Sequence, residues 1–283
     1  MHIPDGFLSP PVWAAFDIAA VPAVGLLARR SHGSFQEPAG QRRIPLLGVM
    51  GAFVFAAQMI NFPIAAGTSS HLVGGALLAI ALGPSSASLV MVAILALQAF
   101  VFQDGGILAL GANIFNMAIA GVFAGYLPYR LWGAAHRSFA IFLGGVLSVS
   151  LSAALALTEL TLSRVVITRH LLMLSVAIFA ASALAEGAIT VAAVRAIDRL
   201  RPDLIRSPAG SRWPAIWIAA AFALLIAALV AASSHPDGIE NLLAVQPLQF
   251  SWMKKAAAGL FGIALTFFVC FAGAKLLARR RSA

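Results

Sequence analysis

Apolar residues form long unbroken runs in this chain, and polar residues are confined to short stretches between them. A helix needs roughly 20 apolar residues to cross the hydrocarbon core of a bilayer. A shorter run, 71–82, ends at Gly83-Pro84, which ends or kinks a helix, so it is either a short ninth pass or a re-entrant piece. The longer runs predict membrane helices near residues 10–28, 45–62, 85–102, 107–129, 138–160, 170–196, 213–232 and 255–277.

The composition supports a membrane protein and excludes several other classes. Hydrophobic residues make up 61% of the 283 residues, charged residues only 10%, and the mean hydropathy is +0.93. A soluble domain carries about 25% charged residues, so a soluble enzyme and a disordered protein are both excluded. Cys270 is the only cysteine, which excludes a disulfide scaffold.

The basic residues predict the orientation of the helices. If 71–82 counts as a crossing and the N-terminus lies outside, all but four of the 19 Lys and Arg residues fall on the cytoplasmic side. The four exceptions are Arg164, Arg169, Lys254 and Lys255. We therefore predict an all-α polytopic membrane helical bundle of about nine segments, seven plus two, with the C-terminus in the cytoplasm. This placement also explains the net charge of +9 without a nucleic-acid partner.

A basic stretch divides the chain into two parts. Residues 1–197 form the predicted seven-helix domain, 198–212 a basic cytoplasmic linker, and 213–283 a two-helix domain with an extracellular loop at 233–254. The start does not resemble a cleavable signal peptide, because it carries Asp5 and lacks a basic region, so we expect Met1 to remain. The sequence contains no GxxxxGK[ST] phosphate loop, so we expect this chain not to hydrolyse ATP by that machinery.

The opening Met1-His2 is a candidate chelator of a transition metal. The Met1 amine, the deprotonated His2 amide and the His2 Nδ1 atom can bind one ion in a plane, and a second imidazole would complete four nitrogens. Such a square-planar set suits Ni(II) or Cu(II). The alternative is that His2 is an ordinary exposed residue near a frayed terminus. Pro4-Asp5-Gly6 favours the chelate, because it predicts a tight turn that folds the terminus back onto the protein.

His71 is the candidate second imidazole, because the predicted topology places it on the outer side with His2. Thr68, Ser69 or Ser70 is expected to cap the short helix that follows. Gly74 and Gly75 would let another helix pack closely. The alternative is a hydrogen-bonded histidine at a helix start.

Several polar residues flank these candidates. We expect Gln58, Asn61 and Ser70 to orient the His71 loop, since outer hydrogen bonds fix metal-binding imidazoles. Helix packing is the expected role of most of the others, namely Gln103, Asn113 and Asn116, and Asp104-Gly105-Gly106 is expected to be an outer turn.

Three segments together resemble one family of metal transporters. MHIPDGFLSP (1–10), QMINFPIAAGTSSHLVGG (58–75) and QDGGILALGANIFNM (103–117) are similar to the nickel/cobalt substrate-binding (M) subunits of energy-coupling factor (ECF) transporters. The resemblance spans roughly the first 200 residues. The last two predicted helices resemble the small accessory (N) subunit of these systems, fused in line.

The resemblance implies a substrate-specific component, not an enzyme, in the cytoplasmic (inner) membrane of a prokaryote. It implies that Met1, His2 and His71 hold Ni(II), with Co(II) as the alternative, and that no organic cofactor takes part. It also implies a membrane coupling (T) subunit and cytoplasmic ATPase subunits as partners. Ser70 replaces the glycine or other small residue of many relatives. His235 and Asp237 would help to admit the metal, or would form a simple turn.

Two further groups of residues leave alternatives open. The acids Asp17, Glu159 and Glu186 lie in or beside apolar runs, so an ion-coupled secondary carrier or a membrane enzyme is the competing hypothesis. Small residues at every fourth position could receive a partner helix or pack internally; they are Ala15, Ala19 and Ala23. His32 is expected to face solvent.

Overall fold

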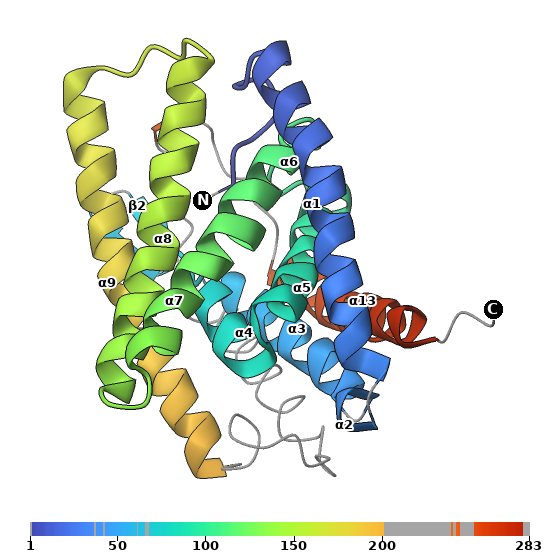
Figure 1. Ribbon diagram of the computed structural model, residues 1–283. Helices are drawn as coiled ribbons and strands as arrows, with labels where there is room; N and C mark the ends of the chain where they lie inside the picture. Colours follow the sequence, from blue (N-terminus) through green and yellow to red (C-terminus); the bar gives the residue numbers. More distant parts are fainter. Residues whose placement is uncertain are drawn as a thin grey trace.

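The computed structural model describes residues 2–36, 38–41, 43–60, 62–65, 68–200, 239, 242–243 and 252–279, without the side chains of 38–39, 62–65, 68–70 and 252–255. Helices dominate this part of the chain (Figure 1). The helices and strands are α1 Pro10–Gln36, α2 Pro38–Gln41, α3 Ile44–Gln58, β1 Phe62–Ala65, β2 Thr68–Ser70, α4 Gly75–Leu82, α5 Pro84–Leu97, η1 Gln98–Phe102, α6 Leu110–Asn113, η2 Ile114–Gly121, α7 Val122–Trp132, α8 Arg137–Leu162, α9 Arg169–Leu200 and α13 Trp252–Ala278.

The predicted membrane runs agree with the described helices. Six helical stretches are long and apolar enough to cross a membrane, and α3 is a shorter apolar helix of 15 residues. The run predicted at 213–232 lies outside the described residues. The chain is therefore a multi-pass helical membrane protein. The count of nine membrane segments remains a prediction.

Helix α4 lies at the centre of the bundle. All eight of its residues are buried, and a helix that is apolar on every side belongs in a core. Eight residues rise only about 12 Å, which is less than the thickness of the hydrocarbon core. Only residues 75–82 of the predicted 71–82 run are helical. Residues 71–74 enter the bundle as irregular chain.

The segment before α4 departs from the all-helical expectation. Strands β1 and β2 pair antiparallel, with Phe62 opposite Ser70 and Pro63 opposite Ser69. The prediction that Thr68, Ser69 or Ser70 caps the following helix is wrong, because the cap of α4 is Gly74, with φ of 78°. A side chain at Gly74 would lie 2.5 Å from Val54 Cγ1 and one at Gly75 2.9 Å from Ser148 Oγ, so the expected close packing of both glycines is confirmed.

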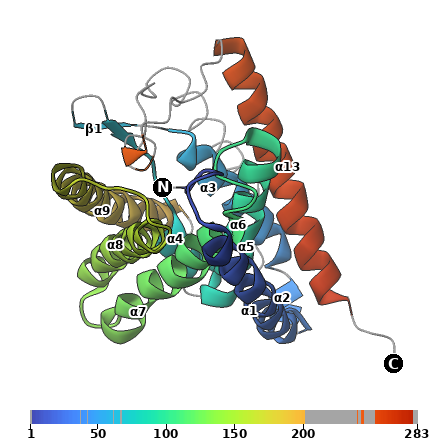
Figure 2. The same cartoon turned by 90° about the horizontal axis from the view of Figure 1, so that it is seen from above.

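Helix α13 belongs to the predicted accessory domain and packs on α3. A Cβ atom at Gly48 would lie 2.9 Å from the Phe267 backbone oxygen, and one at Gly51 2.9 Å from Cys270 Sγ, so the two helices approach closely. Figure 2 looks along the long helices α8 and α9 and shows α13 at nearly full length. Helix α13 therefore crosses the bundle at a steep angle.

Candidate metal site

The N-terminal segment folds back onto the loop between η1 and α6. The Asn113 side chain accepts a hydrogen bond from the Ile3 amide at 2.9 Å and donates one to the Ile3 carbonyl at 3.1 Å. The Gly106 amide also donates to the Ile3 carbonyl at 2.9 Å. Ile3 is fully buried. Hydrogen bonds therefore hold both backbone polar groups of Ile3, the residue directly after His2.

Asp5 fixes the turn that the sequence predicts. Its carboxylate accepts hydrogen bonds from the Ile107 amide at 3.0 Å and the Leu108 amide at 2.8 Å. Gly6 adopts φ of 90°, which a residue with a side chain rarely adopts. Gly106 packs directly against this turn, because a Cβ atom at Gly106 would lie 2.6 Å from the Asp5 nitrogen. The Pro4-Asp5-Gly6 turn is thus present and folds the first residues inward.

His2 and His71 meet inside the molecule. Their rings are nearly parallel, with an angle of 8° between the planes and 5.7 Å between the centroids. Only 5% of His2 is exposed. Within the described ranges its buried Nε2 atom has no hydrogen-bond partner, whereas its Nδ1 atom lies near a carboxylate. A buried polar group without a hydrogen bond costs about 1–3 kcal/mol, so the His2 ring is not explained by packing alone.

Asp104 faces the same ring. Its Oδ1 atom lies 3.1 Å from His2 Nδ1, and about half of its side chain is exposed. Desolvation raises the pKa of the Asp104 carboxyl, but the electrostatic interaction and hydrogen bond with the adjacent His2 and, to a smaller extent, the interaction with His71 outweigh this effect. The net pKa of Asp104 lies well below its usual range. The carboxylate therefore stays ionised beside His2 at neutral pH.

The loop that carries His71 is held by polar side chains from two helices. Glu186 on α9 accepts hydrogen bonds from the Val73 and Gly74 amides, both at 2.8 Å. Gln58 on α3 donates to the Val73 carbonyl at 2.7 Å and accepts from Gln98 at 2.8 Å. Irregular backbone survives at membrane depth only when the protein satisfies its polar groups. Glu186 and Gln58 meet this requirement for Val73.

The sequence did not reveal three of these contacts. The sequence predicts a turn at Asp104, yet Asp104 contacts His2. It predicts helix packing for Asn113, yet Asn113 hydrogen-bonds to Ile3. Glu186 was considered only as a carrier acid, yet it supplies the helix cap that Ser70 and its neighbours do not. No pattern in a single sequence indicates pairings between residues more than 100 positions apart.

Some of the other predicted site residues are described by the structure, and the rest lie outside the described residues. Gln58 contacts the His71 loop as expected. Ala15 and Ala19 are exposed and Ala23 is half-buried, so much of this stripe faces outward. Met1, Asn61, His235 and Asp237, and the side chain of Ser70, lie outside the described residues.

The acids of the competing carrier hypothesis are all engaged in structural contacts. Asp17 accepts a hydrogen bond from the Gly111 amide at 2.7 Å. Glu159 is buried and accepts one from the Asn116 side chain at 2.8 Å. Asn116 in turn accepts one from Ser152 at its backbone oxygen, 2.8 Å away. These contacts brace η2 and α6 against neighbouring helices.

Comparison with known proteins assigns the family. Residues 2–204 match the family described as the cobalt uptake substrate-specific transmembrane region, CbiM. The chain belongs to the CbiM family. It is 38% identical over 264 residues to a protein of Archaeoglobus fulgidus named "Putative fused nickel transport protein NikMN", covering 88% of this chain and 84% of that protein. This extent is consistent with an M subunit fused to an N subunit.

Two further relatives support the assignment. The "Cobalt transport protein CbiM" of Acetoanaerobium sticklandii is 38% identical over 150 residues, covering 52% of this chain and 61% of that protein. A solved structure titled as a transition metal transporter superposes with a TM-score of 0.62 at 33% identity, covering 73% of this chain and 96% of that one. This CbiM-family chain is therefore a cobalt or nickel uptake component and a transport protein.

Proposed function

We propose that this protein captures Ni(II), with Co(II) as the alternative, through the Met1 amine, the His2 amide, His2 Nδ1 and the His71 imidazole. It would act as the substrate-binding component of an ATP-driven ECF importer. The observation that carries the proposal is the meeting of two imidazole rings, a buried one beside the chain terminus and a partly buried one more than 60 residues away.

The ring separation fits two imidazoles on one ion. Metal–nitrogen bonds of about 2 Å place the centroids of two neighbouring imidazole ligands about 4.5 Å apart, and those of two opposite ligands about 6.5 Å apart. The observed 5.7 Å lies between these values. In the proposed chelate His71 occupies the position next to His2 Nδ1, so binding would draw the rings together by about 1 Å.

The hydrogen bonds of His71 indicate which nitrogen binds. Its Nδ1 atom lies 2.9 Å from the Leu72 carbonyl oxygen. A carbonyl only accepts, so Nδ1 carries the proton and the lone pair resides on Nε2. We therefore assign Nε2 of His71 as the metal ligand. For His2 the chelate ring requires Nδ1, because Nε2 is out of reach of an ion on the same residue's amide.

The selectivity of the proposed site follows from the amide nitrogen. Ni(II) and Cu(II) favour a planar set of nitrogens, whereas Mg(II) and Ca(II) favour oxygen and Zn(II) favours a tetrahedron. Each donor must lose a proton before it binds, so affinity would fall on acidification.

The partners proposed from the family are a membrane T subunit, for which Ala15, Ala19 and Ala23 offer an outward face, and cytoplasmic ATPases. The site would face outward from the cytoplasmic membrane of a prokaryote.

The decisive experiment adds one residue ahead of Met1. The full-length protein, purified with its native start, is titrated with nickel by calorimetry beside the extended form. We expect at least a 100-fold loss of affinity, because the extension converts the primary amine into an amide. His2→Ala and His71→Ala should lose binding, whereas Asp17→Asn, which removes a carboxylate from α1, should retain it. Unchanged affinity in the extended protein would contradict the chelate.

A further inference from the structure

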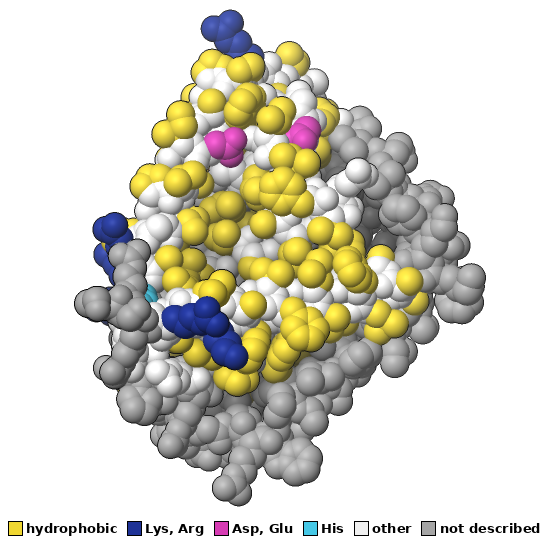
Figure 3. Space-filling model, turned by 90° about the vertical axis from the view of Figure 1, so that its right-hand side faces the viewer, with side chains coloured by type: hydrophobic (Ala, Val, Ile, Leu, Met, Phe, Trp, Pro, Cys, Tyr) yellow, Lys and Arg dark blue, Asp and Glu magenta, His cyan; other side chains and the backbone are white. Residues whose placement is uncertain are grey.

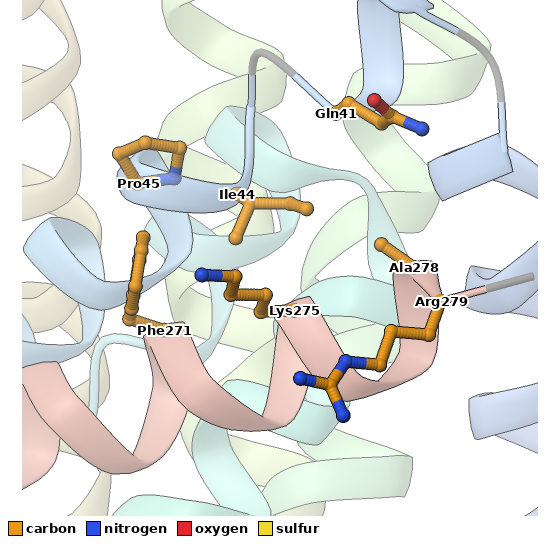
Figure 4. Close-up of a pocket in the computed structure, with 7 residues that line it drawn as sticks. All are labelled: Gln41, Ile44, Pro45, Phe271, Lys275, Ala278 and Arg279. Atoms are coloured by element: carbon orange, nitrogen blue, oxygen red, sulfur yellow. The ribbon is translucent and has the colours of Figure 1, made fainter.

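A cavity of about 390 Å³ lies between the end of α13 and the start of α3, and neither His2 nor His71 lines it. Its apolar lining comes from Ile44 and Pro45 on α3 and from Phe271 and Ala278 on α13. Lys275, Arg279 and Gln41 form the polar part. Figure 4 shows the Lys275 ammonium extending toward Ile44 and Arg279 following α13. The cavity thus combines an apolar floor with two cationic side chains.

The position of this cavity is fixed by contacts between α1 and α13. His32 on α1 bonds to the Leu277 carbonyl, and Gln36 donates to the Ala278 carbonyl at 3.1 Å. The expectation that His32 faces solvent is therefore wrong. These contacts place the end of α13 level with the end of α1, where Arg29 and Arg30 are exposed. Basic residues at the ends of apolar helices mark the headgroup layer of a bilayer.

The described residues supply no counter-charge for the two cations of this cavity. Among the residues that the structure describes, no carboxylate lies within ion-pair distance of Lys275 or Arg279. The side of the molecule shown in Figure 3 is largely hydrophobic, with Lys and Arg side chains at its top, at its left edge and toward its lower left. A basic pocket between membrane helices at this depth suits the phosphate of an anionic lipid. An apolar floor suits the adjoining glycerol and acyl chain.

We propose that this cavity binds an anionic phospholipid of the cytoplasmic leaflet, with Lys275 and Arg279 on the headgroup phosphate and an acyl chain along Ile44 and Phe271. A lipid held there contacts α3 of the metal-binding domain and α13 of the accessory domain together. It would join the two domains at the headgroup layer. The proposal does not depend on the metal ligands.

The experiment is native mass spectrometry of the full-length protein titrated with phosphatidylglycerol or with phosphatidylcholine. We expect phosphatidylglycerol adducts at lower lipid concentration than phosphatidylcholine adducts. The double variant Lys275→Gln/Arg279→Gln should bind phosphatidylglycerol about 30-fold more weakly, from about fivefold for each basic side chain near a lipid phosphate. Lys275→Arg/Arg279→Lys keeps both charges and should bind nearly as well as the unchanged protein.

The matched control is Arg130→Gln/Arg199→Gln, which removes two charges from exposed residues that do not line the cavity. We expect this control to bind phosphatidylglycerol within twofold of the unchanged protein. Equal loss in the control would overturn the proposal, since the lipid would then respond only to total charge. Equal binding of the two lipids, or displacement of phosphatidylglycerol by millimolar inorganic phosphate, would also overturn it.

Discussion

His2 Nδ1 lies 3.1 Å from Asp104 Oδ1, so the nitrogen that the proposed chelate uses faces a carboxylate that stays ionised. An anion at this position would attract a divalent ion and stabilise it after binding. The same anion would also compete with the metal for the ring nitrogen. The two effects have opposite signs, and a single substitution separates them.

We expect Asp104→Asn to weaken nickel binding about tenfold. A half-exposed carboxylate close to a divalent ion contributes on the order of 1.4 kcal/mol after solvent screening, which corresponds to that factor. Isothermal titration calorimetry measures the change. Asp198→Asn is the control, because Asp198 pairs with Arg137 at 2.7 Å, away from the histidines. Tighter binding in Asp104→Asn would show that competition for Nδ1 is the larger effect.

Glu186→Gln should lower both the melting temperature and the nickel affinity. The glutamine has one acceptor oxygen, so it cannot serve both the Val73 and the Gly74 amide, and the loss of a charged hydrogen bond costs about 1.5–3 kcal/mol. The His71 loop would then lose one of the two hydrogen bonds that Glu186 accepts from it. Glu159→Gln, whose partner is Asn116, should keep nickel affinity within about threefold. Loss of affinity in Glu159→Gln alone would instead support the ion-coupled carrier.

Gly106→Ala should release the N-terminal segment. The added methyl group would lie 2.6 Å from the Asp5 nitrogen and 2.8 Å from the Pro4 carbonyl carbon, both backbone atoms that cannot rotate away. Amide hydrogen exchange of Ile3, Asp5 and Gly6 should accelerate at least tenfold, and nickel binding should weaken with it. Gly25→Ala has no atom within 4 Å of the added group and should change neither quantity. Unchanged exchange in Gly106→Ala would mean that the loop yields without releasing the terminus.

Gly262→Ala should separate α13 from α3 without affecting metal binding. A Cβ atom there would overlap the Phe55 ring and lie 2.9 Å from Phe102 Cζ. Overpacking of this kind costs about 1–3 kcal/mol, so the melting temperature should fall. Gly273→Ala on the same helix meets nothing within 4 Å and should melt like the unchanged protein. A loss of nickel affinity in Gly262→Ala would indicate that the accessory helix also shapes the site.

Local pattern predicted much of the fold. Apolar runs indicated the six long helical stretches, because a membrane helix satisfies its own backbone and needs only length and hydrophobicity. Pro4-Asp5-Gly6 indicated the N-terminal turn for an equally local reason. The steep crossing of α13, the β1–β2 hairpin and the late start of α4, at Gly75 instead of residue 71, were not predicted, since they depend on packing between distant segments.

The candidate site was predictable only in part. His2 and His71 were indicated by chelate chemistry and by the sidedness of the topology, and the structure brings their rings together. The residues that hold them in place were not indicated. Asn113, Asp104 and Glu186 act through backbone and side-chain partners that only the folded chain brings near, and their identity as polar residues in apolar surroundings fits many roles.

The irregular backbone at Val73 determines the order in which this segment and α9 enter the membrane. Lipid cannot hydrogen-bond to its amide and carbonyl. The side chains that do so are Gln58 on α3 and Glu186 on α9, and Glu186 lies 113 residues further along the chain. We therefore expect this segment to stay at the water interface during synthesis until α9 has entered the bilayer. The loop bearing His71 is thus completed late, and a truncated chain lacking α9 would leave it outside.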